Sequence, residues 1–223
     1  MAPECELECV LIDDGSRDDT SEESRKCFAW SPRAVYARHP QNRGLGAAVR
    51  TGFLKATGEV VCTIDSDCTF DPLNIPEMLR VMETQRVDIV TASPYHPQGG
   101  VENVLPWRLL LSRGASVLYR RLCACKLYTY TSLMRAYRRQ VIETVAFESN
   151  GFSATTELLL RAAHQGYTVA EVPMVLKSRV IGVSKMKVAY TIRTHLGLMA
   201  QALWWRLFNS RSAIVLAKNT AGN

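Results

Sequence analysis

The sequence lacks the features that mark secreted, disulfide-stabilised or membrane-spanning proteins. Its seven cysteines are an odd number without regular spacing, and no C-x-x-C pair occurs, which argues against a disulfide framework and against a structural zinc site. The first residues are acidic and contain no apolar core, so we expect no signal peptide. The longest uncharged apolar-rich stretch near the end, residues 194–205, is shorter than the roughly 20 residues of a membrane span. We therefore expect a cytoplasmic protein in a reducing compartment.

Acidic residues are absent after Glu171, whereas eight of the 27 Lys and Arg residues lie beyond it. The formal net charge of +6 therefore comes from the C-terminal end. A basic end on a near-neutral body suits an anionic partner such as phosphate or a lipid surface. Nucleic-acid binding would predict a basic groove interleaved with aromatic residues. Because the basic excess is confined to the end of the chain, we expect no nucleic-acid binding.

Several common catalytic motifs are also missing. The four histidines have no metal-ligand spacing, and neither a P-loop nor a G-x-S-x-G motif occurs. The pair Gly44 and Gly46 lacks the third glycine of a dinucleotide-binding loop. These absences argue against a P-loop NTPase, a serine hydrolase and a Rossmann dehydrogenase.

What the sequence does contain is an alternation of strand and helix patterns. With 223 residues, 47% of them hydrophobic, the chain fits one globular domain with at most a small appendage. Strands are predicted at residues 7–12, 34–37, 59–64 and 88–92, with helices over 20–31, 44–58 and 71–85 between them. This order predicts an α/β fold with a mostly parallel sheet and helices on both faces. Beyond a mobile loop at 94–103, we expect helices over 107–125, 151–165 and 188–208 and a strand over 167–176.

Two acidic clusters follow predicted strands, Asp13-Asp14-Gly15-Ser16 and Asp65-Ser66-Asp67. Ligands of such sheets bind beyond the carboxyl ends of the strands, so we expect the two clusters to meet in one crevice. Carboxylates two residues apart can hold a hard divalent cation together with a diphosphate. The structural alternative is that Asp67 and Asp71 cap helices and that Asp13 to Ser16 form a turn.

Several basic residues are candidates for phosphate contacts, because guanidinium groups match phosphate oxygens. They are Arg113, Arg135, Arg179 and Lys185. For any one of these residues, the alternative interpretation is that it is a solvated cation on the protein surface.

An ordered series of segments resembles family 2 glycosyltransferases of the GT-A fold, and more narrowly the polyprenyl- or dolichyl-phosphate sugar synthases. The resemblance runs from about residue 8 to 187. It is carried by residues 10–20, 39–48, 57–59, 65–67, 71–72, 131–132, 135–139, 171–173, 179 and 182–185.

The resemblance implies a role for each matching position on the donor side. Asp14, with Asp13, Gly15 and Ser16 beside it, would contact the nucleotide of the sugar donor. Asp65 and Asp67 would hold Mg²⁺ or Mn²⁺ and the donor diphosphate.

On the acceptor side, Arg113 and Arg135 would face the phosphate of a polyprenyl or dolichyl acceptor. Arg179 and Lys185 would lie in a segment that closes over the diphosphate. The implied reaction is an inverting transfer of a hexose from a UDP-glucose or GDP-mannose type of donor. A lipid phosphate is already ionised and needs no strong base, whereas a hydroxyl acceptor would need one, for which Glu157 is the only candidate.

The chain also departs from the family pattern. The family begins with a further strand that helps to enclose the base, so residues 1–187 are expected to form a catalytic domain lacking that strand. Thr129 occupies a position that is usually acidic. Alternatives are therefore an impaired fragment or non-catalytic scaffold of the same fold, and a transferase with a soluble or protein-bound acceptor. Residues 188–223 are expected to form a basic amphipathic helix and tail that lie on anionic membrane surfaces.

Overall fold

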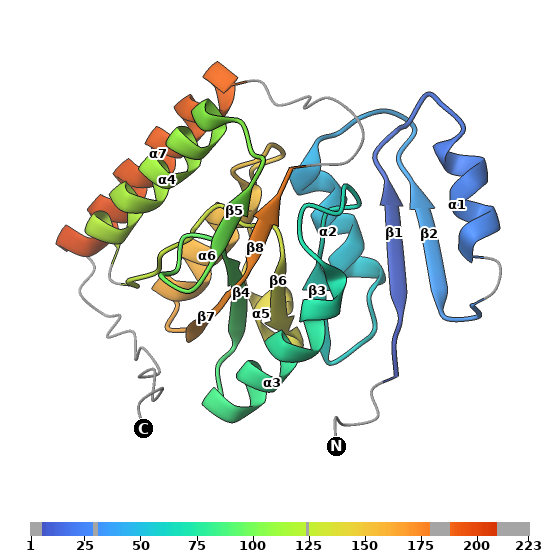
Figure 1. The fold of residues 1–223 in the computed structure, drawn as a ribbon, viewed down its shortest axis with the longest axis horizontal. Helices are drawn as coiled ribbons and strands as arrows, with labels where there is room; N and C mark the ends of the chain where they lie inside the picture. Colours follow the sequence, from blue (N-terminus) through green and yellow to red (C-terminus); the bar gives the residue numbers. More distant parts are fainter. Residues whose placement is uncertain (1–5, 29–30, 124, 179–187, 209–223) are drawn as a thin grey trace.

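The computed structural model describes all residues except 1–5, 29–30, 124, 179–187 and 209–223 (Figure 1). Arg179 and Lys185 therefore lie outside the described residues. The first half contains β1 (Cys9–Asp13), α1 (Thr20–Phe28), β2 (Ala34–Arg38), α2 (Leu45–Lys55), β3 (Val60–Thr63), a 3₁₀ turn (Pro72–Asn74), α3 (Ile75–Gln85) and β4 (Ile89–Ser93). The second half contains β5 (Gly100–Glu102), α4 (Pro106–Leu122), β6 (Arg135–Arg138), α5 (Arg139–Thr144), α6 (Ala154–His164), β7 (Val169–Pro173), β8 (Val175–Lys177) and α7 (Val188–Phe208).

The main sheet has the strand order β3-β6-β4-β7. Strands β4 and β7 are parallel, and β6 runs antiparallel to both β3 and β4. The strands β5 and β8 form a separate parallel pair. The expected mostly parallel α/β architecture is confirmed, with β6 as an antiparallel strand that the sequence reading did not assign.

Two hydrophobic cores lie on opposite faces of the main sheet, because successive side chains of a strand point to opposite sides. Ile89 belongs to the core with α4, α5, α6 and α7, whereas its neighbour Val90 belongs to the core with α3. All five residues of β4 are buried. Helices on both faces therefore cover this sheet, as the sequence pattern predicts.

The strands β1 and β2 form a parallel pair of their own, which is not hydrogen-bonded to β3 within the described residues (Figure 1). α2 packs against β1, and α1 packs against β2. None of the residues of α1 is buried. The N-terminal part thus lies beside the main sheet without contributing a buried core of its own.

The predicted ends of the helices agree with the structure where residues close in the sequence determine them. α1 begins at Thr20 and α7 spans 188–208, as expected. Asp71 caps the 3₁₀ turn by accepting a hydrogen bond from the Leu73 N–H at 2.9 Å. By contrast, the expected loop at 94–103 contains β5, and the expected strand at 167–176 is two strands, β7 and β8, separated at Met174. These differences arise where pairing between distant segments decides the structure.

Candidate active site

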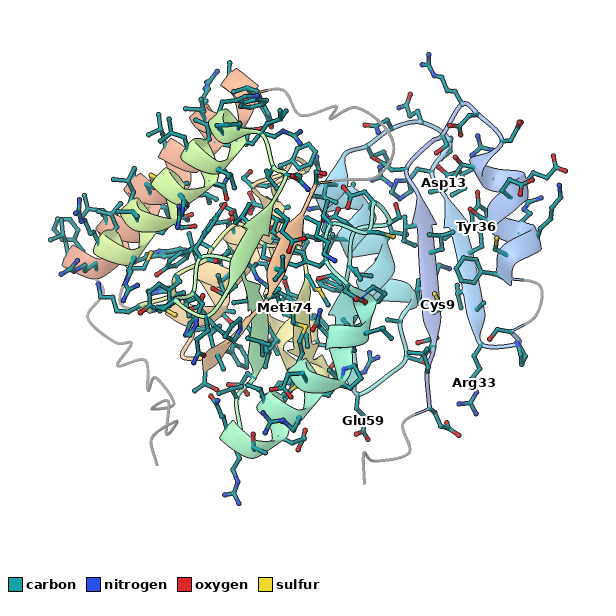
Figure 2. The ribbon with its side chains drawn as sticks, in the orientation of Figure 1. Cys9, Asp13, Arg33, Tyr36, Glu59 and Met174 are labelled. Carbon is teal, nitrogen blue, oxygen red and sulfur yellow. The ribbon has the colours of Figure 1, made fainter. Side chains whose placement is uncertain are left out.

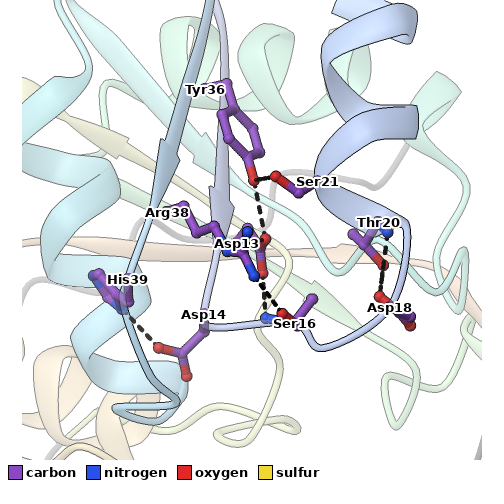
Figure 3. Close-up of polar contacts among 9 residues, drawn as sticks. All are labelled: Asp13, Asp14, Ser16, Asp18, Thr20, Ser21, Tyr36, Arg38 and His39. Atoms are coloured by element: carbon purple, nitrogen blue, oxygen red, sulfur yellow. Dashed lines mark hydrogen bonds and ion pairs between the residues drawn. The ribbon is translucent and has the colours of Figure 1, made fainter.

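The first acidic cluster orders the loop that follows β1. Asp13 is 5% exposed, and its carboxylate accepts hydrogen bonds from the Ser16 N–H at 2.8 Å and the Tyr36 hydroxyl at 2.9 Å (Figure 3). Arg38 pairs with the same carboxylate at 3.3 Å. Burial acts to raise the pKa of Asp13, but these hydrogen bonds and the Arg38 charge outweigh it and leave the pKa below the usual 3.8. The structure therefore uses Asp13 to position the loop.

Asp14 connects that loop to the segment that enters α2. Its Oδ1 lies 2.6 Å from Nδ1 of the buried His39 (Figure 3). The same oxygen accepts a hydrogen bond from the Arg43 N–H at 2.9 Å. Its Oδ2 accepts from the Gly44 N–H at 2.7 Å. The other ring nitrogen of His39 lies 2.9 Å from the Thr51 hydroxyl within α2. His39, to which the sequence assigned no catalytic role, is thus a positioning residue for Asp14.

Gly15 is required by the close approach of the two loops. It has a positive φ of 75°, and a Cβ there would lie 2.5 Å from the Gln41 carbonyl carbon. Only glycine combines that backbone angle with so small a volume. The segments 13–16 and 39–44 therefore form one rigid pair of loops at the carboxyl ends of β1 and β2.

The second acidic cluster follows β3, as the strand pattern predicts. Asp65 and Asp67 are both half-buried, and Asp67 accepts a hydrogen bond from the Thr69 N–H at 3.2 Å. Asp65 lines a cavity of about 130 Å³. Asp67 therefore takes part in a local turn and does not cap a helix as the structural alternative expected, since the next helical segment begins at Pro72 with Asp71 as its cap. Asp65 lines the pocket.

The pocket beside Asp65 is rich in hydroxyl groups. Besides Asp65, its lining comprises Thr69, Phe70, Pro94, Tyr95, Ser112, Thr129, Thr131, Ser132, Leu133 and Leu176. The hydroxyls of Ser112 and Thr131 lie 2.6 Å apart. Burial raises the pKa of Tyr95, so its phenol stays a neutral hydroxyl. Such a wall of neutral donors and acceptors suits a polyhydroxylated or phosphorylated ligand.

The loop that forms this wall is held from behind by Glu171. Its carboxylate accepts hydrogen bonds from the N–H groups of Tyr128 and Thr129 at 2.8 and 2.9 Å. The Thr129 hydroxyl lies 2.9 Å from that of Ser93 at the end of β4. The sequence indicated Thr129 only as a departure from the family pattern and gave no sign that Tyr95 and Ser112 line a pocket. Tyr95 contacts Thr129, 34 residues away, and Ser112 contacts Thr131, 19 residues away, so the pocket forms only when these segments come together.

The two predicted acceptor arginines occupy very different surroundings. Arg113, on α4, is exposed, and its guanidinium carbon lies 5.5 Å from the ring centre of the pocket residue Tyr95. Arg135 is fully buried and donates to the Thr91 hydroxyl and to the carbonyls of Tyr130 and Thr155. The expectation that Arg135 faces the acceptor is therefore not met, because its three side-chain nitrogens are bound to the protein interior.

The carboxylate of Glu157 is likewise bound to other groups of the protein. It is 3% exposed and accepts hydrogen bonds from the N–H groups of Glu148 and Ser149 at 3.1 and 2.9 Å, and it pairs with Arg161 at 2.8 Å. Burial acts to raise its pKa, but these contacts outweigh it and leave the pKa below the usual 4.5. Glu157 therefore fixes the loop before α6, and this geometry does not suit a general base.

Asp65 and Asp67 fit the ligand chemistry of Mg²⁺ or Mn²⁺. Both are oxygen donors at the end of β3, and a hard cation takes one or two carboxylates together with substrate phosphates. Across the described ranges, no group of three or more His, Cys, Asp or Glu side chains could hold a metal ion. A site here would accordingly need the oxygen atoms of its substrate to complete the coordination.

Comparison with solved structures identifies the fold. Glucosyl-3-phosphoglycerate synthase from Mycobacterium tuberculosis, in complex with Mn²⁺, uridine-diphosphate-glucose and phosphoglyceric acid, superposes with a TM-score of 0.61 at 19% identity. The match covers 88% of this chain and 67% of that one. The fold is thus GT-A-like.

Sequence comparison identifies the family. The model of glycosyl transferase family 2 matches residues 2–146, and the chain belongs to this family of glycosyltransferases. It is 33% identical over 189 residues to polyprenol monophosphomannose synthase of Mycolicibacterium smegmatis, covering 81% of this chain and 71% of that protein. It is 32% identical over 183 residues to dolichol-phosphate mannosyltransferase of Pyrococcus furiosus, covering 81% of this chain and about half, 51%, of that protein.

Proposed function

We propose that the chain transfers a hexose from a nucleotide sugar to a polyprenyl phosphate, with Mg²⁺ or Mn²⁺ held by Asp65 and Asp67. The observation that carries the proposal is the half-buried carboxylate pair beside a hydroxyl-lined pocket, with Arg113 at its edge. The two curated relatives support the acceptor class and favour mannose as the sugar.

The donor is proposed to lie across the ends of β1 and β3. The rigid loops at Asp14 and Gly15 would contact the nucleotide, and Asp65 and Asp67 would hold the cation and diphosphate. A bound cation would stabilise the diphosphate as a leaving group. The carboxylate pair alone carries too much negative charge to hold a diphosphate, which is why the proposal requires metal.

The proposed reaction needs no protein base. One oxygen of the acceptor phosphate forms a bond to the anomeric carbon while the bond from that carbon to the donor diphosphate breaks, with inversion. A phosphate monoester is largely ionised near neutral pH, so no proton has to be removed. The carboxylate of Glu157 is already bound to two backbone N–H groups and to Arg161, which favours a phosphate acceptor over a hydroxyl acceptor. The protein then contributes mainly by positioning the substrates and by stabilising charge.

The surface of α4 and α7 supports a lipid-linked acceptor. The two helices pack side by side at one end of the molecule (Figure 1). They contain six arginines and no acidic residue. Large apolar side chains are exposed on both, among them Trp107, Leu110, Leu196, Trp204 and Phe208. Exposed apolar groups among cations are typical of surfaces that lie on anionic lipid.

This surface differs from the amphipathic helix expected from the sequence. α7 buries Leu198, Met199 and Ala202 and also exposes Leu203 and Leu207, so it is apolar on both sides. Within the described ranges, no helix is long and apolar enough to cross a membrane. We propose peripheral contact through α4 and α7 together, with Arg113 directed to the phosphate of the acceptor.

The direct test is sugar transfer measured with labelled GDP-mannose and UDP-glucose. The acceptors are dolichyl phosphate in vesicles and, as a soluble comparison, 3-phosphoglycerate, each with Mg²⁺, Mn²⁺ or a chelator. The proposal expects metal-dependent transfer to dolichyl phosphate only. Transfer to the soluble acceptor alone, or no transfer at all, would contradict it.

Matched variants test the assigned residues. Asp65→Asn and Asp67→Asn should each lower transfer by about 10²- to 10³-fold, because a group that stabilises developing charge is lost. Asp71→Asn is the control, since Asp71 caps the following turn and asparagine caps equally well. Equal activity in all three variants would remove the carboxylate pair from the mechanism.

A further inference from the structure

The segment that leads into α6, residues 147–150, forms neither a helix nor a strand. A backbone without such structure needs other partners for its N–H and C=O groups. On one side of the segment, Glu157 of α6 accepts hydrogen bonds from the N–H groups of Glu148 and Ser149 at 3.1 and 2.9 Å. An ionised carboxylate can only accept, so Glu157 holds these N–H groups and leaves the carbonyls of the segment to other donors.

The carbonyl groups of the 147–150 segment are held from α2. Arg50 donates to the carbonyls of Phe147 and Ser149 at 3.4 and 3.1 Å. It also donates to the side-chain oxygen of Asn150, and its guanidinium carbon lies 5.1 Å from the ring centre of Phe147. A guanidinium group only donates. Arg50 therefore complements the carboxylate on the other side, and the two charged side chains together bind both kinds of backbone group.

The beginning of α2 lies against this segment with no room for a side chain between them. The Gly46 N–H donates to the Asn150 carbonyl at 2.8 Å, and a Cβ on Gly46 would overlap the Ser149 carbonyl oxygen. A Cβ on Gly44 would likewise overlap the Asn150 carbonyl oxygen. Only glycine allows backbones to approach so closely. A displacement of the 147–150 segment would therefore displace the beginning of α2 as well.

The beginning of α2 in turn holds Asp14. The Gly44 N–H donates to Asp14 Oδ2 at 2.7 Å, and α2 packs against β1 as well as against α6. Figure 2 shows the preceding residue, Asp13, at the opposite end of β1 from Cys9, which is the end where the loops of the proposed nucleotide site lie. Asp14 and the 147–150 segment therefore contact the same residue, Gly44, from two sides.

We propose that Arg50 and Glu157 are positioning residues for the donor side of the active site. They fix the 147–150 segment, the segment fixes the beginning of α2, and α2 fixes Asp14 in the orientation that would contact the nucleotide. The inference rests on the proposed function for its ligand, a nucleoside diphosphate, whereas the series of contacts is independent of it. It gives Glu157 a role on the donor side that requires no proton transfer.

Charge and positioning predict opposite results for a substitution of Glu157. Glu157→Gln removes a negative charge, which by itself favours the binding of an anionic nucleotide. The same change replaces one of the two accepting oxygens with an amino group that cannot accept the second N–H, so positioning predicts weaker binding. Arg50→Lys keeps the positive charge but loses the planar fork that binds several oxygens at once. It should therefore weaken nucleotide binding although the net charge is unchanged.

Two measurements on the full chain test the proposal. The first is binding of Mn²⁺ with UDP or GDP by titration calorimetry, in which Gly46→Ala, Arg50→Lys and Glu157→Gln should each raise the Kd of the nucleotide at least about tenfold. The second is amide hydrogen exchange by NMR without any ligand. The Gly44 N–H, which is bound to Asp14, should exchange at least about tenfold faster in all three variants. The amides of β4 should keep their protection.

Two matched controls separate positioning from general damage. Gly52→Ala makes the same change in the same helix as Gly46→Ala, but its Cβ would make an ordinary contact with Ile12 at 3.7 Å. Ser153→Ala removes a buried hydroxyl next to α6 that has no hydrogen-bond partner among the described residues. Neither control should change the nucleotide Kd or the exchange of the Gly44 amide by more than about twofold.

Unchanged exchange of the Gly44 amide in Arg50→Lys and Glu157→Gln would overturn the proposal. Tighter nucleotide binding by Glu157→Gln, the result that charge alone predicts, would also overturn it. Faster exchange without weaker nucleotide binding would do the same, because Asp14 would then be positioned without serving the donor. Failure of the wild type to bind either nucleotide would count against the proposed function instead, and the exchange of Gly44 would still decide whether the two residues position Asp14.

Discussion

The N-terminal part, with β1, β2 and α1, differs from the main sheet in what holds it together. β4 is buried along its whole length between two hydrophobic cores, whereas β1 and β2 are half-exposed and α1 buries nothing. The N-terminal part is instead fixed by hydrogen bonds through Asp13, Asp14 and His39.

This difference separates stability from ligand recognition. Apolar burial supplies most of the folding free energy, and it is concentrated in the main sheet. The polar N-terminal loops supply the backbone geometry at the proposed nucleotide site. α2 joins the two parts, since the N–H of Gly46 donates to the Asn150 carbonyl at 2.8 Å. We therefore expect substitutions in the main sheet to lower the free energy of unfolding of the whole chain, and substitutions in the N-terminal loops to act locally on the backbone of the proposed nucleotide site.

The largest effect should come from Arg135 in the main sheet. Arg135→Met removes the donors to Thr91, Tyr130 and Thr155 and leaves buried acceptors without partners. We expect a loss of about 3–5 kcal/mol in the free energy of unfolding, measured by urea denaturation. The matched control Arg113→Met, at an exposed position, should leave stability unchanged and lower transfer to the lipid acceptor. A loss below about 1 kcal/mol for Arg135→Met would contradict the structural role given to Arg135.

A smaller and more local effect is expected for Asp14. Asp14→Ala removes the partner of His39 and of two backbone N–H groups, at a cost of about 1–3 kcal/mol. Hydrogen exchange should show lost protection in β1 and β2 with β4 unaffected. The control Asp19→Ala, in the same loop, should change neither region. Uniform loss across both parts would show that the N-terminal part is not a separate unit.

Lowering the pH should reduce the stability of both parts, first through Glu157 in the main part and then through Asp13 in the N-terminal part. The folded pKa of Glu157 is lowered from 4.5 and that of Asp13 from 3.8, so each stabilises the folded state above those values and loses its contribution as pH falls through the folded pKa. Stability should decline first below about pH 4.5 and further below about pH 3.8. Glu157→Gln should flatten the first decline. If the free energy of unfolding of this variant falls as steeply below about pH 4.5 as that of the wild type, Glu157 is not the group that titrates.

The smallest effect should come from the surface of α1. Lys26 pairs with Glu22 and Glu23 at 2.9 and 3.1 Å, and all three side chains are mostly exposed. Because such pairs contribute little in water, Lys26→Ala should leave the urea midpoint unchanged within error. A clear shift would mean that α1 contributes more to stability than its exposure indicates.

Local signals made much of the fold predictable. Thr20 and Asp71 start their helical segments as expected, and the acidic clusters follow strands. The roles of Arg135 and Glu157 were not predictable, because a charged residue at the surface and one buried among carbonyls look alike in sequence. β6 and the hydroxyl pocket depend on pairing between segments far apart in the chain, which no local pattern encodes.

The most direct test of the central claim is binding of Mn²⁺ together with UDP or GDP, measured by electron paramagnetic resonance of the metal. The account predicts that wild type and Asp71→Asn bind the metal–nucleotide pair alike. Asp65→Asn combined with Asp67→Asn should bind it at least about tenfold more weakly. Equal binding by the double variant would show that the carboxylates after β3 do not hold the cation.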